Sequence, residues 1–184
     1  MKNPVLEAIK SRRSIRRYLP DQIKDVELAA ILEAGSYAPS AHNEQPWHFT
    51  VIRNKELLDR ISDKSKELMA AQETQWIKAM GQNPDLHIFY KAPVVVLVST
   101  RTGAMSPEVD CSAAIENMLL AAESLDIGSC WIGLARYFFS LKAELPLLGI
   151  PDGYEPFYAV TLGYKAQRPS RALPRRKDQV NYLD

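Results

Sequence analysis

The sequence is poor in cysteine and has no long apolar run. Of its 184 residues only Cys111 and Cys130 are cysteines, and their spacing fits neither a Cys-x-x-Cys redox motif nor a metal site. Free cysteines are most often buried core residues, so we expect two reduced thiols and no disulfide. No stretch approaches the roughly 18 apolar residues that a membrane-spanning helix needs, and the charged N-terminal segment is not typical of a signal peptide. We therefore expect a cytoplasmic protein that does not contact membranes.

Motifs for catalysis by the protein's own side chains are also absent. The sequence contains no Gly-x-Ser-x-Gly, P-loop, His-Glu-x-x-His or Gly-x-Gly-x-x-Gly motif. Its three histidines, His42, His48 and His87, have no metal-ligand spacing with acids or cysteines, so no metal site is expected. If the protein is an enzyme, we expect a cofactor to supply the reactive atom.

The basic residues are unevenly distributed. The chain has 23 basic and 22 acidic residues, but residues 10–17 contain five basic residues, residues 165–177 contain six, and neither segment contains an acid. We call these the N-terminal basic segment and the basic tail. Because the rest of the chain is acidic, a broad nucleic-acid surface is not expected, whereas two concentrated basic segments suit a compact anion such as a phosphate. The length and the ordinary globular composition, 46% hydrophobic and 24% charged, predict one domain spanning residues 1–184.

Hydrophobic periodicity and capping residues predict a mixture of helices and strands. The expected helices begin after Asn3 and span about 25–34, 54–65, 67–80, 107–126 and 140–148, and the expected strands span 47–53, 93–100, 128–134 and 157–164. The unbroken apolar run at 93–100 should lie in the middle of a sheet. An arginine-rich turn is expected over residues 11–18.

Three features have two interpretations each. The small-residue turn at residues 38–43, between a helix and a strand, is either an ordinary connection or a place where backbone N–H groups approach a ligand. Asp110 and Asn117 share one face of an otherwise apolar helix, and they either satisfy hydrogen bonds within the fold or contact a ligand. The apolar residues of 67–80, Trp76 among them, either pack on the core, which we favour, or cover a ligand site.

Several motifs follow one another along the chain. Arg12-Arg13-Ser14-Ile15-Arg16 precedes Ala-Pro-Ser-Ala-x-Asn-x-Gln-Pro-Trp-x-Phe at 38–49, an alanine-rich helix, Gly-x-x-x-x-Gly at 128–133, and Leu-Gly-Tyr at 162–164 before the basic tail. This order resembles the nitroreductase family of flavin mononucleotide (FMN) enzymes over nearly the whole chain. The resemblance implies an α+β fold with a central, mostly antiparallel sheet flanked by helices. It also implies an interlocked homodimer that exchanges C-terminal tails and binds flavin at its interface.

The resemblance implies a role for each polar residue of the first motif. Arg12 and Ser14 would lie near the flavin phosphate and ribityl chain, and Arg13 would contribute mainly its backbone. Arg16 would lie by the pyrimidine edge of the flavin ring, where a cation stabilises the negative charge that the ring gains on two-electron reduction. The flavin would carry the chemistry, with no catalytic side chain and with Arg16 as electrostatic support.

The remaining flavin contacts implied by the resemblance come from three other segments. The small-residue turn would come from the partner subunit, the strand end at 132–133 would offer backbone amides near flavin N5, and the basic tail would reach the phosphate. The residues are Pro39, Ser40, Ala41 and Asn43 of the turn, Ile132 and Gly133 of the strand end, and Arg175, Arg176 and Lys177 of the tail. Asn43 would bond either within the turn or to the cofactor.

The resemblance implies an NAD(P)H-dependent FMN oxidoreductase. NADH or NADPH would give hydride to flavin N5 and leave, and an electron-poor small molecule of nitroaromatic or quinone type would then take it in a ping-pong mechanism. Alternatives on the same fold are oxidation, desaturation, reductive removal of a substituent, or a flavin-binding redox sensor with little turnover. The basic segments alone would fit a phosphate-binding module. The chain is short for the family, so we expect a short lid and an open pocket. Residues 67–90 match no family motif, so the acceptor stays open, as does the preferred nicotinamide.

Overall fold

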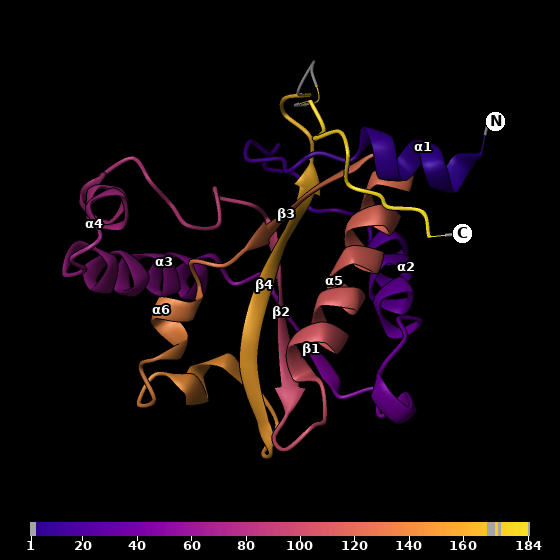
Figure 1. Ribbon diagram of the computed structural model, residues 1–184. Coiled ribbons are helices and arrows are strands. Elements are labelled where there is room, and N and C mark those ends of the chain that lie inside the picture. The colour runs from indigo at the N-terminus through magenta and orange to yellow at the C-terminus, as the bar shows by residue number, and fades with distance from the viewer. Residues whose placement is uncertain (1–2, 169–171, 173, 184) are drawn as a thin grey trace.

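The computed structural model describes residues 3–168, 172 and 174–183. Its centre is a four-stranded sheet in the order β1-β2-β4-β3, in which every neighbouring pair is antiparallel (Figure 1). The strands are β1 (Trp47–Ile52), β2 (Val94–Arg101), β3 (Ile127–Ile132) and β4 (Tyr154–Tyr164). β2 lies inside the sheet and is buried along its whole length except at its last residue. The expected α+β fold and the central position of the apolar strand are confirmed.

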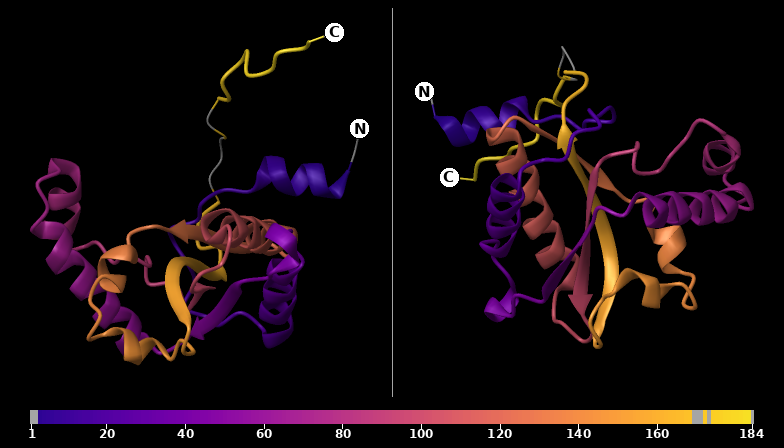
Figure 2. Two further views of the ribbon diagram at one scale, coloured as in Figure 1. Left: turned by 60° about the horizontal axis from the view of Figure 1, so that its bottom comes forward. Right: turned by 180° about the vertical axis from the view of Figure 1, so that it is seen from behind.

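Helices cover both faces of the sheet (Figure 1 and Figure 2). On one side lie α1 (Pro4–Ser11), α2 (Asp25–Ser36) and α5 (Pro107–Ser124), and on the other lie α3 (Lys55–Ala70), α4 (Gln75–Gln82) and α6 (Arg136–Phe139). Two short 3-10 helices are η1 (Ala41–Asn43) and η2 (Leu145–Leu148). Side chains alternate along β2, so Val96 and Val98 belong to the core under α5, while Val95 and Leu97 belong to the core under α3. Within the described ranges, no helix is long and apolar enough to cross a membrane.

The helix expected over residues 67–80 is wrong in its boundaries. α3 continues through Ala70 because its buried face runs on to Met69, and α4 begins only at Gln75. Met69 is buried, as favoured from the sequence, but Trp76 is 61% exposed and its neighbour Ile77 is the residue of α4 that is buried. The core interpretation is therefore wrong for Trp76.

Two other boundaries differ from the expectation, and each involves a proline. Residues 140–148 do not form one helix: α6 ends at Phe139, and Pro146, which lacks an N–H, lies in the short helix η2. β4 begins at Tyr154 and contains Pro156, which the sheet accommodates at a register shift between Val98 and Ser99 of β2.

Both cysteines are buried and free, as expected. Burial raises the pKa of Cys111 to about 11, and it also raises the pKa of Cys130. Because thiols react as thiolates, we predict that the folded protein does not react with Ellman's reagent at pH 8. Protein unfolded in guanidinium should release one equivalent of dye for each of its two cysteines. Rapid labelling of either cysteine in the folded protein would contradict this prediction.

Candidate functional site

The N-terminal basic segment lies along the edge of the sheet rather than in a turn. Ser14 pairs with Ser129 of β3 as a parallel bridge, and the N–H of Ile15 donates to the carbonyl of Ser129 at 2.9 Å. Further along, the N–H of Leu19 donates to the carbonyl of Tyr164 at the end of β4. The turn expected at 11–18 is wrong because β3, the last strand of the sheet, offers unpaired backbone groups to this segment.

The extended backbone puts alternate side chains of this segment on one side. The side chain of Cys130 in β3 lies near this segment. Burial raises the pKa of the Cys130 thiol, and Arg16, the Ser14 hydroxyl and Arg12 each partly offset that rise. Ser14 and Arg16 also line a hollow of about 200 Å³. The structure therefore places Ser14 and Arg16 beside β3, with Arg12 at the start of the same segment, where α1 ends.

Arg13 points elsewhere. Its Nη1 donates to the carbonyl of Lys10 at 2.8 Å and to the carbonyl of Arg12 at 2.7 Å, where α1 ends. The guanidinium of Arg13 is thus hydrogen-bonded to neighbouring backbone carbonyls, which leaves mainly the backbone of Arg13 to contact a ligand. Arg12 is less constrained, since its Nε lies 3.7 Å from the carboxylate of Glu116.

β3 runs from this cluster to an open glycine. Ile132 is 3% exposed and pairs with Ala159 of β4, whereas the next residue, Gly133, is exposed. A Cβ built on Gly133 would meet no atom within 4 Å, so its backbone faces open space. At about 3.3 Å per residue, Gly133 lies roughly 10 Å along the chain from Cys130.

Arg16 has a partner that was not identified from the sequence. The Nε–H of Arg16 donates to the hydroxyl of Tyr90 at 3.2 Å, and the guanidinium carbon lies 5.7 Å from the centre of the Tyr90 ring. Tyr90 lies 74 residues further along the chain, in the segment that matches no motif. No local signal in the sequence could have identified it.

The small-residue turn lies at the other end of α2 and α5 from the N-terminal basic segment (Figure 1 and Figure 2). The N–H of Ala41 donates to both carboxylate oxygens of Asp110, at 3.2 and 3.3 Å. The side-chain oxygen of Asn43 accepts a hydrogen bond from Nε2 of Gln45 at 2.9 Å. One of the two bonding modes expected for Asn43, a hydrogen bond within its own loop, is therefore present, and a bond to the cofactor stays a prediction.

Asp110 binds the backbone of this turn, and Asn117 binds the backbone of α2, which leads into it. Asp110, which is 3% exposed, holds the N–H of Ala41. Nδ2 of Asn117 donates to the carbonyl of Ala34 in α2 at 3.0 Å. Of the two interpretations of these polar residues, hydrogen bonding within the fold is the one observed.

The basic tail leaves the body of the molecule. Its start is fixed near the end of α5, where Lys165 forms ion pairs with Glu123 at 2.8 Å and with Asp126 at 3.2 Å, and Arg168 also pairs with Asp126. Beyond this point the described residues run away from the sheet and helices (Figure 2). The exposed residues there include Arg175, Arg176 and Lys177.

A single chain thus assembles only part of the expected site. The N-terminal basic segment lies against the strand that ends at 132–133, whereas the small-residue turn lies at the far end of the helices and the tail extends outward. In the turn, Pro39 and Asn43 are exposed, and Ser40 and Ala41 are partly buried.

Comparisons with known proteins identify the family of the chain. The family model described as the nitroreductase family matches residues 9–164. A relative from Archaeoglobus fulgidus, provisionally named NADH dehydrogenase/NAD(P)H nitroreductase, is 40% identical over 159 residues, which cover 86% of this chain and 84% of the relative. A solved nitroreductase with bound FMN from Bacteroides fragilis is 36% identical, with a TM-score of 0.90. A solved nitroreductase with bound FMN from Desulfitobacterium hafniense is 29% identical, with a TM-score of 0.88. Each match covers 100% of both chains. The chain therefore belongs to the nitroreductase family.

Proposed function

We propose that this protein passes reducing equivalents from NADH or NADPH to an electron-poor small molecule, of nitroaromatic or quinone type, in a ping-pong sequence. When bound, FMN supplies the chemistry, because its ring can accept and return a hydride. Assignment as an NAD(P)H-dependent FMN oxidoreductase rests on the family, the name of the Archaeoglobus relative and the FMN bound in the two solved relatives. A cytoplasmic location stays a prediction.

The residues present fit FMN, and the arrangement of the N-terminal basic segment carries the proposal. Arg12 and Ser14 offer the guanidinium and hydroxyl donors that suit a phosphate monoester. Arg16 adds a permanent positive charge on the same side of the segment. The open space at Gly133 admits a flat ring close to the backbone. One region beside β3 can therefore hold both an anionic group and a ring.

We further propose that a second copy of the chain completes the site in a homodimer. The small-residue turn lies away from the N-terminal basic segment of its own chain. The tail starts beside that segment, where the N–H of Ala166 donates to the carbonyl of Arg17 at 3.1 Å, and then runs outward. Large apolar side chains are exposed on the side of α1, α2 and α5, and such a dimer would cover them. They include Val5, Leu6 and Ile9 of α1, Val26 of α2 and Val109 of α5.

The visible spectrum of the purified protein tests this function. We expect a yellow protein with stoichiometric flavin, which anaerobic addition of NADH or NADPH bleaches and a nitroaromatic or quinone restores. A colourless protein that does not take up added FMN would contradict the proposal. A yellow protein that neither nucleotide bleaches would instead favour a redox sensor or a different electron donor.

A further inference from the structure

The contact between Tyr90 and Arg16 leaves most of the guanidinium available. Arginine has five N–H donors, and the hydroxyl of Tyr90 takes the one on Nε. The four donors on the terminal nitrogens remain for a ligand. Within the described part of the chain no carboxylate forms an ion pair with Arg16, so its charge is not neutralised by a neighbouring acid. Tyr90 therefore restrains this cation without using up its charge.

Tyr90 lies in a strained turn. Tyr90 and Lys91 both have a φ of 54°, in the left-handed region that residues other than glycine rarely adopt. Two backbone hydrogen bonds close the turn, from the N–H of Tyr90 to the carbonyl of His87 at 2.8 Å and from the N–H of Ala92 to the carbonyl of Phe89 at 3.0 Å. Strain of this kind persists only where the surroundings impose it, and it clusters at functional sites.

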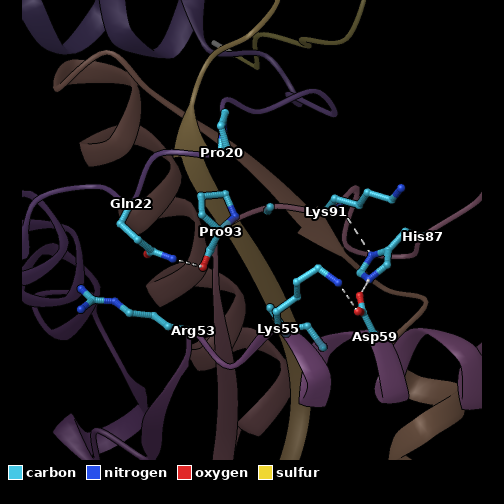
Figure 3. Close-up of a pocket in the computed structure, with 10 residues that line it drawn as sticks. Pro20, Gln22, Arg53, Lys55, Asp59, His87, Lys91 and Pro93 are labelled. Atoms are coloured by element: carbon cyan, nitrogen blue, oxygen red, sulfur yellow. Dashed lines mark hydrogen bonds and ion pairs between the residues drawn. The ribbon is translucent and has the colours of Figure 1, made fainter.

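His87 fastens this turn to α3 (Figure 3). Its Nδ1 accepts the N–H of Phe89 at 3.2 Å and that of Lys91 at 3.4 Å, which leaves the proton on Nε2 to donate to Asp59 at 3.2 Å. Burial lowers the pKa of His87, so the ring is neutral at pH 7 and Nδ1 stays an acceptor. The position of Tyr90 is thus set by α3 through His87 rather than by its own backbone preference.

We propose that Tyr90 is a positioning residue for Arg16. The strained turn holds the phenol against Nε of Arg16 and so restricts the orientations in which the terminal N–H groups meet the flavin. This inference rests on the proposed function, because Arg16 acts through its charge beside the flavin ring. A freely moving Arg16 would stabilise the extra negative charge of the reduced ring less well.

The ratio of the affinities for reduced and oxidised FMN measures this effect without reference to turnover. Arg16→Ala should lower the ratio most. Tyr90→Phe keeps the ring but removes the hydroxyl, and it should lower the ratio by about threefold to tenfold, the effect of one hydrogen bond. A tenfold fall corresponds to about 30 mV in the midpoint potential of a two-electron couple. His87→Ala releases the turn and should change the ratio in the same direction.

A double variant and a matched pair separate positioning from a general structural effect. Once residue 16 is alanine, adding Tyr90→Phe should change the ratio no further. Tyr137→Phe removes the same kind of contact from another arginine, Arg136, whose Nη2 lies 3.3 Å from the Tyr137 hydroxyl. This control should leave the ratio unchanged.

Three results would overturn the proposal in distinguishable ways. If Arg16→Ala lowers the ratio but Tyr90→Phe acts no more than Tyr137→Phe, Tyr90 does not position Arg16, and the proposed function stands. If His87→Ala does not change the ratio, the turn does not hold the Tyr90 hydroxyl in position. If Arg16→Ala leaves the ratio unchanged, or the protein binds no FMN, the proposal fails together with the flavin role of Arg16.

Discussion

Replacing Gly163 by alanine is expected to lower the free energy of unfolding by about 2 kcal/mol, within the range for overpacked sites. The new Cβ would lie 2.8 Å from Cδ of Pro93 and 2.9 Å from Cδ1 of Tyr18, closer than Cβ atoms approach their neighbours in real proteins. Both neighbours are ring atoms, so relief requires a segment of backbone to move. Tyr18 donates to the carbonyl of Ile15 at 2.6 Å and so fixes the N-terminal basic segment. FMN binding should therefore weaken as well, by about tenfold if 1.4 kcal/mol is lost there.

Urea unfolding and FMN titration check this prediction. Gly133→Ala is the matched control for stability alone, because its Cβ would have open space and its backbone is not left-handed. This control should unfold at the wild-type urea concentration or slightly above it, since alanine restricts the unfolded chain. If Gly163→Ala unfolds at the same concentration as wild type, Pro93 and Tyr18 give way freely and the expected clash is not real.

The packing at Gly163 also shows where prediction from the sequence stops. Glycines are visible in the sequence at both 128 and 163, and the surrounding patterns predict two strands there. The structure pairs Gly128 directly with Gly163 across β3 and β4, and the missing side chains let Ile15 and Tyr18 lie close to the sheet. Which residues face each other depends on the register between strands, which these local patterns do not specify.

Two helix caps were predicted correctly from local chemistry, whereas two features that depend on distant contacts were not predicted. Asn3 and Asn54 cap α1 and α3 with their side chains, as the sequence predicts. The sequence predicts an arginine-rich turn over 11–18, but the free edge of β3 makes the segment extended. The role of Tyr90 was not predicted, because its hydrogen-bond partner Arg16 is distant in sequence and lies near it only in the fold.

Replacing Asp110 by alanine is expected to cost about 2 kcal/mol of stability and to loosen the small-residue turn, because hydrogen bonds to charged groups contribute about 1.5–3 kcal/mol. The buried carboxylate accepts the N–H of Ala41 through both oxygens. It lies in the first turn of α5, where the positive end of the helix dipole stabilises a negative charge. His42 and Asn43 have φ values of 49° and 55°, so the turn relies on such external support. FMN affinity should fall with the loss of this support.

Two further variants control for the effect of Asp110→Ala in the same measurements of unfolding and FMN affinity. Asp110→Asn keeps one oxygen that can accept the N–H of Ala41, so it should lose less of both. Asn117→Ala removes a different hydrogen bond of α5, the one to Ala34 in α2, without touching the turn. We expect that variant to be less stable but to bind FMN as wild type does. Equal weakening of FMN binding in all three variants would trace the effect to general loosening of α5.

Mixed dimers decide whether the turn serves its own subunit or its neighbour. In one dimer, isolated with two different affinity tags, one subunit carries Asp110→Ala and the other carries Arg12→Ala. If each site combines the arginine of one subunit with the turn of the other, this dimer keeps one intact site, whereas a dimer of the double variant with wild type keeps none. If each subunit uses its own turn, the first dimer has no intact site and the second has one. We expect tight FMN binding in the first dimer and not in the second, and the reverse result would assign the turn to the site of its own subunit.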